Sequence, residues 1–187
     1  MSILIAGLGN IGAEYSNTRH NIGFKVLDTL AGVSGINFTV RRYGSVAELR
    51  HKGKSFILLK PSTYMNLSGK AVNYWLAAAK VDLENLLVVV DDVALPLGTL
   101  RMRKQGSDGG HNGLKNISEI LGTDNFARLR IGIGNGYHPG GQIDYVLGEW
   151  SEDQLKELPA IFERASDSVK SFGTAGIERT MNLFNTK

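Results

Sequence analysis

A histidine and two adjacent carboxylates stand where apolar runs give way to polar loops. His20 lies in the loop that follows the N-terminal apolar run 3–6, and Asp91 and Asp92 directly follow the apolar run 86–90. A histidine whose ring is oriented by a carboxylate can act as a general base near neutral pH. Ligands of open α/β sheets bind beyond the carboxyl ends of strands, so both segments are candidate sites.

The glycines at residues 7–12 read Gly-Leu-Gly-Asn-Ile-Gly, which fits the GxGxxG fingerprint of dinucleotide-binding proteins. That fingerprint has to open a helix directly, but helical spacing of apolar residues starts only near residue 22. Asp28 lies close to the position, about 20 residues after the glycines, where the fingerprint has an acidic residue, but it falls inside that helical run. A nucleotide-dependent oxidoreductase is therefore our third-ranked interpretation. The glycines still let backbone approach a ligand, and Asn10 stands among them.

Other chemistries fit the sequence poorly. Ser107 lies near His111, but residues 106–109 read Gly-Ser-Asp-Gly rather than the GxSxG of a nucleophile elbow. His20, Asp91, Asp92 and His111 could form a metal site, although neither HxH nor HExxH spacing is present. The chain contains no cysteine, which excludes thiolate nucleophiles, disulfides and cysteine-based metal centres. We predict neither a metal nor a cofactor.

Length and composition are those of an ordinary globular domain. The 187 residues are 42% hydrophobic and 21% charged, so we expect one domain over residues 1–187. No apolar run approaches the roughly 18 residues of a membrane span, and the N-terminus does not read as a signal peptide, so we expect a cytoplasmic protein. A net charge of +3 permits a nucleic-acid partner without requiring one.

Apolar spacing predicts strands that alternate with helices, with hairpins in between. We expect strands at 3–6, 38–40, 45–49, 55–59, 86–90, 99–103 and 128–133, and helices at 22–30, 70–80 and 114–121. From residue 151 the chain reads as helical, broken or kinked around Pro159 and Gly173. The glycine-rich loop 134–141 is expected to be mobile. The fold class is therefore α/β, with a mixed twisted β-sheet and helices on both faces.

Residues 7–24 resemble the N-terminal signature of the bacterial-type peptidyl-tRNA hydrolases, written in that family as GLGNPG, Y, TRHN and GF. The resemblance continues in the family's order through residues 65–69, 90–92, 109–115, 126–134 and 144–148. Two positions depart from the pattern. Ile11 stands where the family usually has proline, and Asp108 stands where relatives often carry a small residue or histidine.

The resemblance implies hydrolysis of the ester bond between peptide and tRNA, with Asn10, His20, Asn66, Asp91 and Asn112 at functional positions. His20 would be the general base, Asp91 would orient its ring, and Asn10 would hold the water or the developing oxyanion. Asp92 is less suited than Asp91 to orient the ring of His20, because neighbouring side chains of a strand face opposite ways and only one of the two would reach it. We assign the following residues to substrate binding: Tyr15, Tyr64, Asn66, His111 and Asn112.

Basic residues cluster in the sequence around the His111 loop. They are Arg101, Arg103, Lys104, Lys115, Arg128 and Arg130. Arginines alternating on two strands would line one face, which favours phosphate recognition. We therefore assign tRNA binding to Arg101, Arg103, Lys104 and Arg130.

The expected partner is peptidyl-tRNA, with no membrane and no obligate protein partner, and we expect a monomer. The alternative is an RNA-binding relative of the same fold without hydrolase activity.

Overall fold

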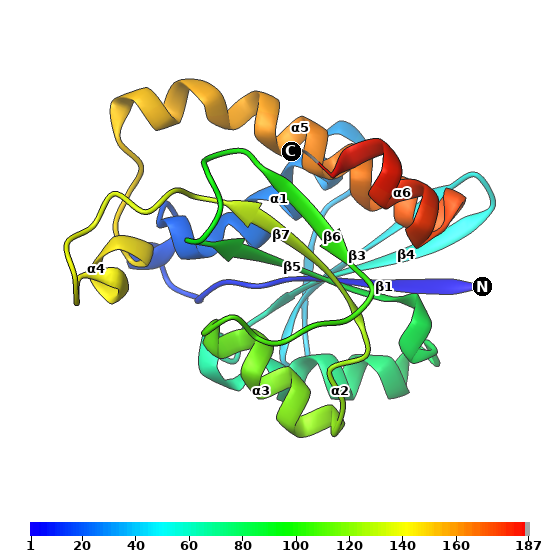
Figure 1. The fold of residues 1–187 in the computed structure, drawn as a ribbon. Helices are drawn as coiled ribbons and strands as arrows, with labels where there is room; N and C mark the ends of the chain where they lie inside the picture. Colours follow the sequence, from blue (N-terminus) through cyan, green and yellow to red (C-terminus); the bar gives the residue numbers. More distant parts are fainter. Residues whose placement is uncertain (186–187) are drawn as a thin grey trace.

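The computed structural model describes residues 1–185, and its centre is one seven-stranded sheet (Figure 1). The strands are β1 (Ser2–Gly7), β2 (Thr39–Arg41), β3 (Gly44–His51), β4 (Lys54–Pro61), β5 (Leu86–Asp92), β6 (Leu100–Arg103) and β7 (Ala127–Gly132). Their order across the sheet is β2-β3-β4-β1-β5-β7-β6. The four strands β4, β1, β5 and β7 run parallel, whereas β2, β3 and β6 are antiparallel to their neighbours. The predicted mixed sheet is confirmed.

Helices cover both faces of this sheet (Figure 1). One face packs against α1 (Ile22–Val33), α5 (Glu152–Ala175) and α6 (Ile177–Phe184), and the other against α2 (Ser68–Ala78) and α3 (Asn112–Leu121). The side chains of β5 alternate between the two cores, with Leu87 and Val89 in one and Val88 and Val90 in the other. This double burial explains why residues 86–90 are uniformly apolar. The short helix α4 (Gln142–Val146) lies beside the ends of the strands (Figure 1).

The predicted break at Pro159 is wrong, because α5 runs through this proline, whereas the break predicted around Gly173 occurs three residues later, at Gly176 between α5 and α6. Proline removes a single backbone donor, and Leu158 beside it is buried in the core, which holds the helix in place. Gly173 serves close packing instead: a Cβ at this position would overlap the ring of Phe56. The helix ends at Gly176, whose φ of 86° lies in the region that favours glycine.

None of the helices in the described part of the chain is both long enough and apolar enough to cross a membrane.

Candidate active site

The loop that carries His20 follows β1 and lies next to the end of the neighbouring parallel strand β5. Strand β1 pairs with β5, and a Cβ on Gly7 at the end of β1 would overlap the carbonyl of Gly23 in α1. Glycine at this position therefore lets α1 begin directly against the sheet. The short 3-10 turn η2 (Arg19–Asn21) precedes α1 and is placed next to the end of β5. This close packing positions His20 beside Asp91.

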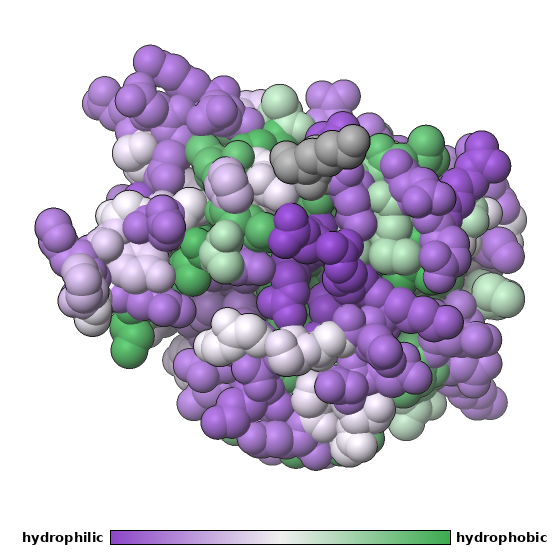
Figure 2. Space-filling model, viewed as in Figure 1, coloured by the Kyte–Doolittle hydropathy of each residue, from purple (hydrophilic) through white to green (hydrophobic). Residues whose placement is uncertain are grey.

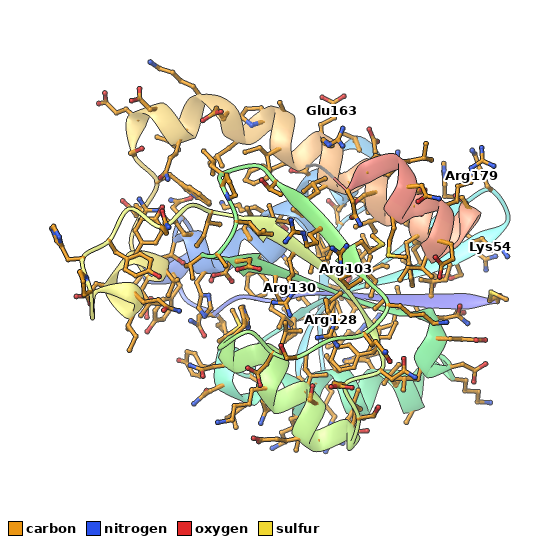
Figure 3. All side chains as sticks on the ribbon, in the orientation of Figure 1. Lys54, Arg103, Arg128, Arg130, Glu163 and Arg179 are labelled. Carbon is orange, nitrogen blue, oxygen red and sulfur yellow. The ribbon has the colours of Figure 1, made fainter. Side chains whose placement is uncertain are left out.

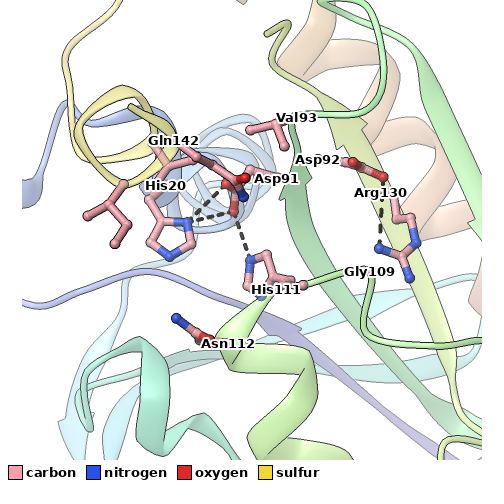
Figure 4. A pocket seen from close by; sticks show the side chains of 12 residues that line it. His20, Asp91, Asp92, Val93, Gly109, His111, Asn112, Arg130 and Gln142 are labelled. Carbon is pink, nitrogen blue, oxygen red and sulfur yellow. Dashed lines mark hydrogen bonds and ion pairs between the residues drawn. The ribbon is translucent and has the colours of Figure 1, made fainter. Parts of the chain in front are cut away.

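Asp91 joins two histidines from separate loops (Figure 4). His20 Nδ1 lies 2.9 Å from both carboxylate oxygens, and His111 Nε2 lies 2.9 Å from Oδ1. The two rings are 5.1 Å apart between centroids. Loop segments distant in sequence thus form one hydrogen-bonded group at the carboxyl end of β5.

The contacts show which nitrogen of each ring carries the hydrogen that Asp91 accepts. His111 Nδ1 accepts from the backbone amides of Gly113 and Leu114 at 3.1 and 3.3 Å, so it caps α3 and its hydrogen is on Nε2. An ionised carboxylate can only accept, so His20 donates from Nδ1. Asp91 engages Nδ1 of His20, so Nε2 is the ring nitrogen that a general base would present to a substrate.

The environment of Asp91 favours its charged form. Burial of this carboxyl would by itself raise its pKa, but the electrostatic attraction of His20 and His111 and the hydrogen bonds that both rings donate outweigh that effect. Together they hold the pKa of Asp91 well below its usual range. The carboxylate therefore stays ionised and keeps both rings oriented.

Asp92 faces away from this group, as strand alternation predicts. Its Oδ1 accepts from the backbone amide of Ala94 at 2.8 Å, and its Oδ2 lies 3.8 Å from Arg130 (Figure 4). Only one of the two adjacent carboxylates reaches the histidines.

Asn10 is fixed from two sides by buried hydrogen bonds. Its backbone exchanges bonds with the side chain of Asn21, at 2.8 Å to Oδ1 and 2.9 Å from Nδ2. Its own Oδ1 accepts from the backbone amide of Met65 at 2.6 Å. Since this oxygen is engaged, the NH₂ group is the end of the Asn10 amide that can serve a ligand.

Two hollows meet at His20 and Asn112. The larger, of about 240 Å³, is lined by Asn10, His20, Met65, Asn66, Asn112, Ile143, Val146 and Leu147. The smaller, of about 130 Å³, extends from His20 past Asp91 and His111 to Asp92 and Arg130. Ile143 and Val146 of α4 line both, so α4 forms one wall of a continuous groove. Asn66 does not cap α2, which begins without a side-chain cap, and its side chain is available to the groove.

Tyr15 and Tyr64 are not brought to these hollows. Neither residue is among those lining the two hollows of the described chain. Tyr64 is half exposed and directly precedes Met65, with a φ of 62°. The assignment of both tyrosines to substrate binding stays a prediction.

The arginines of β6 and β7 form two cross-strand pairs on one face of the sheet. Arg101 lies opposite Arg130, and Arg103 lies opposite Arg128; Figure 3 labels three of these arginines, Arg103, Arg128 and Arg130. The intervening residues Leu100 and Met102 are buried in the core on the other face. Strongly hydrophilic residues gather over these strands (Figure 2). Like charges placed directly opposite are unfavourable, so this face is suited to an anionic ligand.

The two arginines of β7 have different tasks. Arg128 is buried and donates to the carbonyls of Gly106, Ser107, Asp124 and Phe126, so it holds the loop before α3. Burial, followed by the charge of Arg130, lowers its pKa to about 10. Arg130 donates to Ser107 O at 2.5 Å and also lines the smaller hollow. Asp108 helps to fold the same loop, since its Oδ1 accepts from the Gly110 amide at 2.8 Å.

A metal ion is a second possible use of the triad. His20 Nδ1, a carboxylate oxygen of Asp91 and His111 Nε2 lie within 4.8 Å of one another. The hydrogen bonds at 2.9 Å already pair each of these atoms with a suitable partner. The geometry therefore fits a hydrogen-bonded triad without calling for an ion.

Sequence reasoning missed the wall of the groove and the support of Asn10. Gln142, Ile143 and Val146 line the smaller hollow; residues 144–148 carry part of the family resemblance, but nothing in the sequence pointed to a wall of the groove there. Asn21 is buried and positions Asn10, and its place beside His20 in the TRHN block was the one available indication.

Comparisons with known proteins agree over almost the entire chain. The family model described as peptidyl-tRNA hydrolase matches residues 4–187. A peptidyl-tRNA hydrolase of Phocaeicola vulgatus is 59% identical and one of Cytophaga hutchinsonii is 55% identical, each over 187 residues and the full length of both chains. The crystal structure of the peptidyl-tRNA hydrolase of Acinetobacter baumannii superposes with a TM-score of 0.92 at 33% identity, covering 98% of this chain and 94% of that one. This chain belongs to the peptidyl-tRNA hydrolase family.

Proposed function

We propose that this protein hydrolyses the ester bond that joins a peptide to the 3′-terminal ribose of tRNA. The observation that carries the proposal is the contact of His20 with the buried, ionised Asp91, which leaves His20 Nε2 free at the groove. Family membership and the structural match to a peptidyl-tRNA hydrolase support the same reaction. Released tRNA would return to translation in the cytoplasm.

The reaction needs one water molecule and no covalent intermediate. His20 Nε2 removes a proton from water as the oxygen attacks the ester carbonyl, and Asp91 stabilises the imidazolium that forms. The NH₂ of Asn10 donates to the oxygen that gains negative charge. The imidazolium then returns the proton to the departing ribose oxygen, which gives a peptide carboxylate and a free tRNA 3′ end. General-base catalysis of this kind contributes typically about 10²- to 10⁴-fold.

The substrate's two halves would occupy opposite sides of His20. Asn66 and Asn112 line the larger hollow, and each amide can pair with the donor and acceptor of a peptide bond without reading its side chain. The smaller hollow leads toward Arg130 and the arginine face of β6 and β7. We assign the tRNA phosphates to Arg101, Arg103, Lys104 and Arg130. Arg128 is not assigned to phosphate binding, because its guanidinium already donates to backbone carbonyls.

The alternative of an RNA-binding relative without activity is less well supported. Such a protein would have no need for a buried carboxylate that fixes the tautomer of His20, nor for an amide donor held beside it by Met65 and Asn21.

The test is single-turnover release of N-acetyl-aminoacyl-tRNA by the wild type and by His20→Ala, with EDTA present throughout. We expect the wild type to cleave the substrate despite the chelator, and His20→Ala to lose about two or more orders of magnitude in rate while still binding tRNA. Binding without cleavage by the wild type would instead identify an RNA-binding relative. Loss of wild-type activity in EDTA, restored by a divalent metal, would favour the metal interpretation of the triad.

A further inference from the structure

Arg19, the residue before His20, binds the segment that forms the far wall of the groove. Its backbone N–H donates to Gly148 O at 3.0 Å, and its guanidinium donates from Nη1 to Tyr145 O at 3.0 Å. Nε and Nη2 both donate to Gln154 Oε1, at 3.3 and 3.0 Å. The guanidinium carbon lies 4.0 Å from the centroid of the Tyr145 ring. The side chain thus joins the loop of His20 to Tyr145 of α4 and to the start of α5, and the backbone joins this loop to Gly148 after α4.

The contacts of Arg19 continue into a fixed network around Tyr145. The Tyr145 hydroxyl donates to Ile133 O at 2.6 Å and accepts from Gln154 Nε2 at 3.2 Å. A Cβ on Gly148 would lie 2.9 Å from Arg19 Nη1, so the segment passes as closely as glycine allows. Ile143, Val146 and Leu147, which line the larger hollow, belong to this same segment.

The partners of the Arg19 guanidinium are neutral: a carbonyl, an amide oxygen and an aromatic face. Charge neutralisation therefore does not explain the arginine. The arrangement depends on the planar guanidinium of arginine, which donates to two acceptors at fixed angles while it stacks on a ring. The ammonium group of lysine cannot do both.

We propose that Arg19 is a positioning residue that sets the distance between the α4 wall of the groove and His20. This inference rests on the proposed hydrolase function and names a residue that acts on substrate placement, through the wall, without touching the reacting atoms. Removal of Arg19 would leave the contact between His20 and Asp91 in place and release the wall. The cost would appear mainly in KM, because the loss of contacts that bind the ground state and the transition state equally raises KM and leaves kcat nearly unchanged.

The structure offers a second way to hold the same wall. Thr18 and Glu149 form an antiparallel bridge, and the adjacent bond from Arg19 N to Gly148 O makes them a non-hydrogen-bonded pair. The Cα atoms of such pairs are about 4.5 Å apart, within the range that a disulfide spans. Since the chain has no cysteine, Thr18→Cys with Glu149→Cys would introduce the only thiols.

The experiment compares wild type, Arg19→Ala, the cysteine pair alone, and Arg19→Ala combined with the cysteine pair, the last two both oxidised and reduced. Cleavage of N-acetyl-aminoacyl-tRNA gives kcat and KM across pH, and thiol titration verifies the disulfide. Arg164→Ala is the matched control, because Arg164 also donates to a backbone carbonyl, of Phe184 at 2.9 Å, and lies over an aromatic ring at 5.6 Å, but away from the groove.

We expect Arg19→Ala to raise KM by about ten-fold or more, with a much smaller change in kcat and an unchanged shape of the pH profile. Oxidation of the combined variant should restore KM to within about three-fold of wild type, and reduction should abolish that recovery. The cysteine pair alone and Arg164→Ala should behave as wild type. If Arg19→Ala does not fold, as judged by circular dichroism, Arg19→Lys takes its place in each comparison.

Three results would overturn the inference: kinetics of the Arg19 variant within about two-fold of wild type, a loss confined to kcat, or a raised KM that a verified disulfide does not repair. These results leave the proposed function intact as long as the wild type cleaves the substrate. A wild type that binds tRNA without cleaving it would overturn the proposed function itself, and this inference with it.

Discussion

Asp91 is the residue on which the orientation of both histidines depends. One buried carboxylate accepts hydrogen bonds from His20 and His111, and the backbone amides at the start of α3 fix the second ring from its other side. Because His111 is already held as a donor, it supports the charge of Asp91 and does not compete with His20 for the role of base. A change at Asp91 would therefore alter the tautomer of His20, the proposed base, as well as remove the negative charge beside it.

Asp91→Asn should abolish most of the activity, whereas Asp92→Asn should not. An asparagine offers its NH₂ to one of the rings, and His20 can meet it only by moving its hydrogen from Nδ1 to Nε2, where the base is needed. In a triad of known mechanism this change costs about 10⁴-fold in kcat, and we expect a loss of at least about 10² here.

Asp92→Asn is the matched control on the same strand, and we expect its kcat to stay within about ten-fold of wild type. The measurement is single-turnover cleavage together with tRNA affinity, which neither variant should abolish. Equal losses in the two variants would contradict the assignment of Asp91.

Asn10→Asp tests whether the amide of Asn10 acts as a donor. The aspartate keeps an oxygen for the Met65 amide, so the local fold is preserved, but it replaces the NH₂ group with a negative oxygen. We expect kcat to fall by about 10²- to 10³-fold, as when an oxyanion donor is removed, with a similar thermal unfolding temperature. An effect on KM alone would mean that Asn10 binds substrate without stabilising the transition state.

At the scale of elements, the sequence predicts those features that depend on local pattern. The uniformly apolar run before Asp91 indicates a central strand, and the alternation at residues 99–103 places Arg101 and Arg103 on one face. The burial of an individual side chain cannot be predicted from local pattern, because it depends on contacts with residues distant in sequence. Arg128 and Arg130 have equivalent spacing, yet Arg128 is fully buried and Arg130 is not, because the carbonyls of Gly106, Asp124 and Phe126 enclose the guanidinium of Arg128.

In the candidate site, too, some residues could be predicted from the sequence and others could not. Its reactive residues could be named from their types and from family resemblance, since His20 and Asp91 follow apolar runs. The wall that α4 contributes could not, because Ile143 and Val146 are ordinary apolar residues whose role depends on the fold of the 142–150 segment against Arg19. The close packing of α5 at Gly173 likewise involves Phe56, more than a hundred residues away in sequence.

Two glycine substitutions should separate packing from helix propensity. Gly173→Ala in α5 forces a methyl group against the ring of Phe56, and overpacking of this kind costs about 1–3 kcal/mol of unfolding free energy. Gly32→Ala in α1 meets nothing within 4 Å, so we expect it to stabilise the protein by about 0.5–1 kcal/mol through the gain in helix propensity. Denaturant unfolding of both variants is the measurement, and destabilisation by Gly32→Ala would contradict the packing described for α1.

At the scale of the whole molecule, the distribution of charge matters more than its total. The net charge of +3 is small, yet four arginines face one another across β6 and β7 beside the smaller hollow. Other cations lie apart from these arginines, such as Lys54 on β4 and Arg179 on α6, which Figure 3 shows to the right of them. A tRNA held by its phosphates at the arginine face would present its terminal ribose to His20. Binding should then depend on where a positive charge is removed.

The salt dependence of tRNA binding can measure this directly. His20→Ala serves as the background, so that the substrate stays intact while the dissociation constant is followed from low to high salt. Removing one cation that pairs with a phosphate should reduce the slope of log K against log salt by about 0.7 to 0.9. We expect this reduction for Arg103→Gln, whose side chain is exposed on the arginine face, and for Arg130→Gln. Arg179→Gln removes the same charge from α6, which covers the other face of the sheet, and should leave the slope unchanged. An equal reduction in all three variants would mean that the protein attracts tRNA through its overall charge, and the phosphate assignments on β6 and β7 would then be wrong.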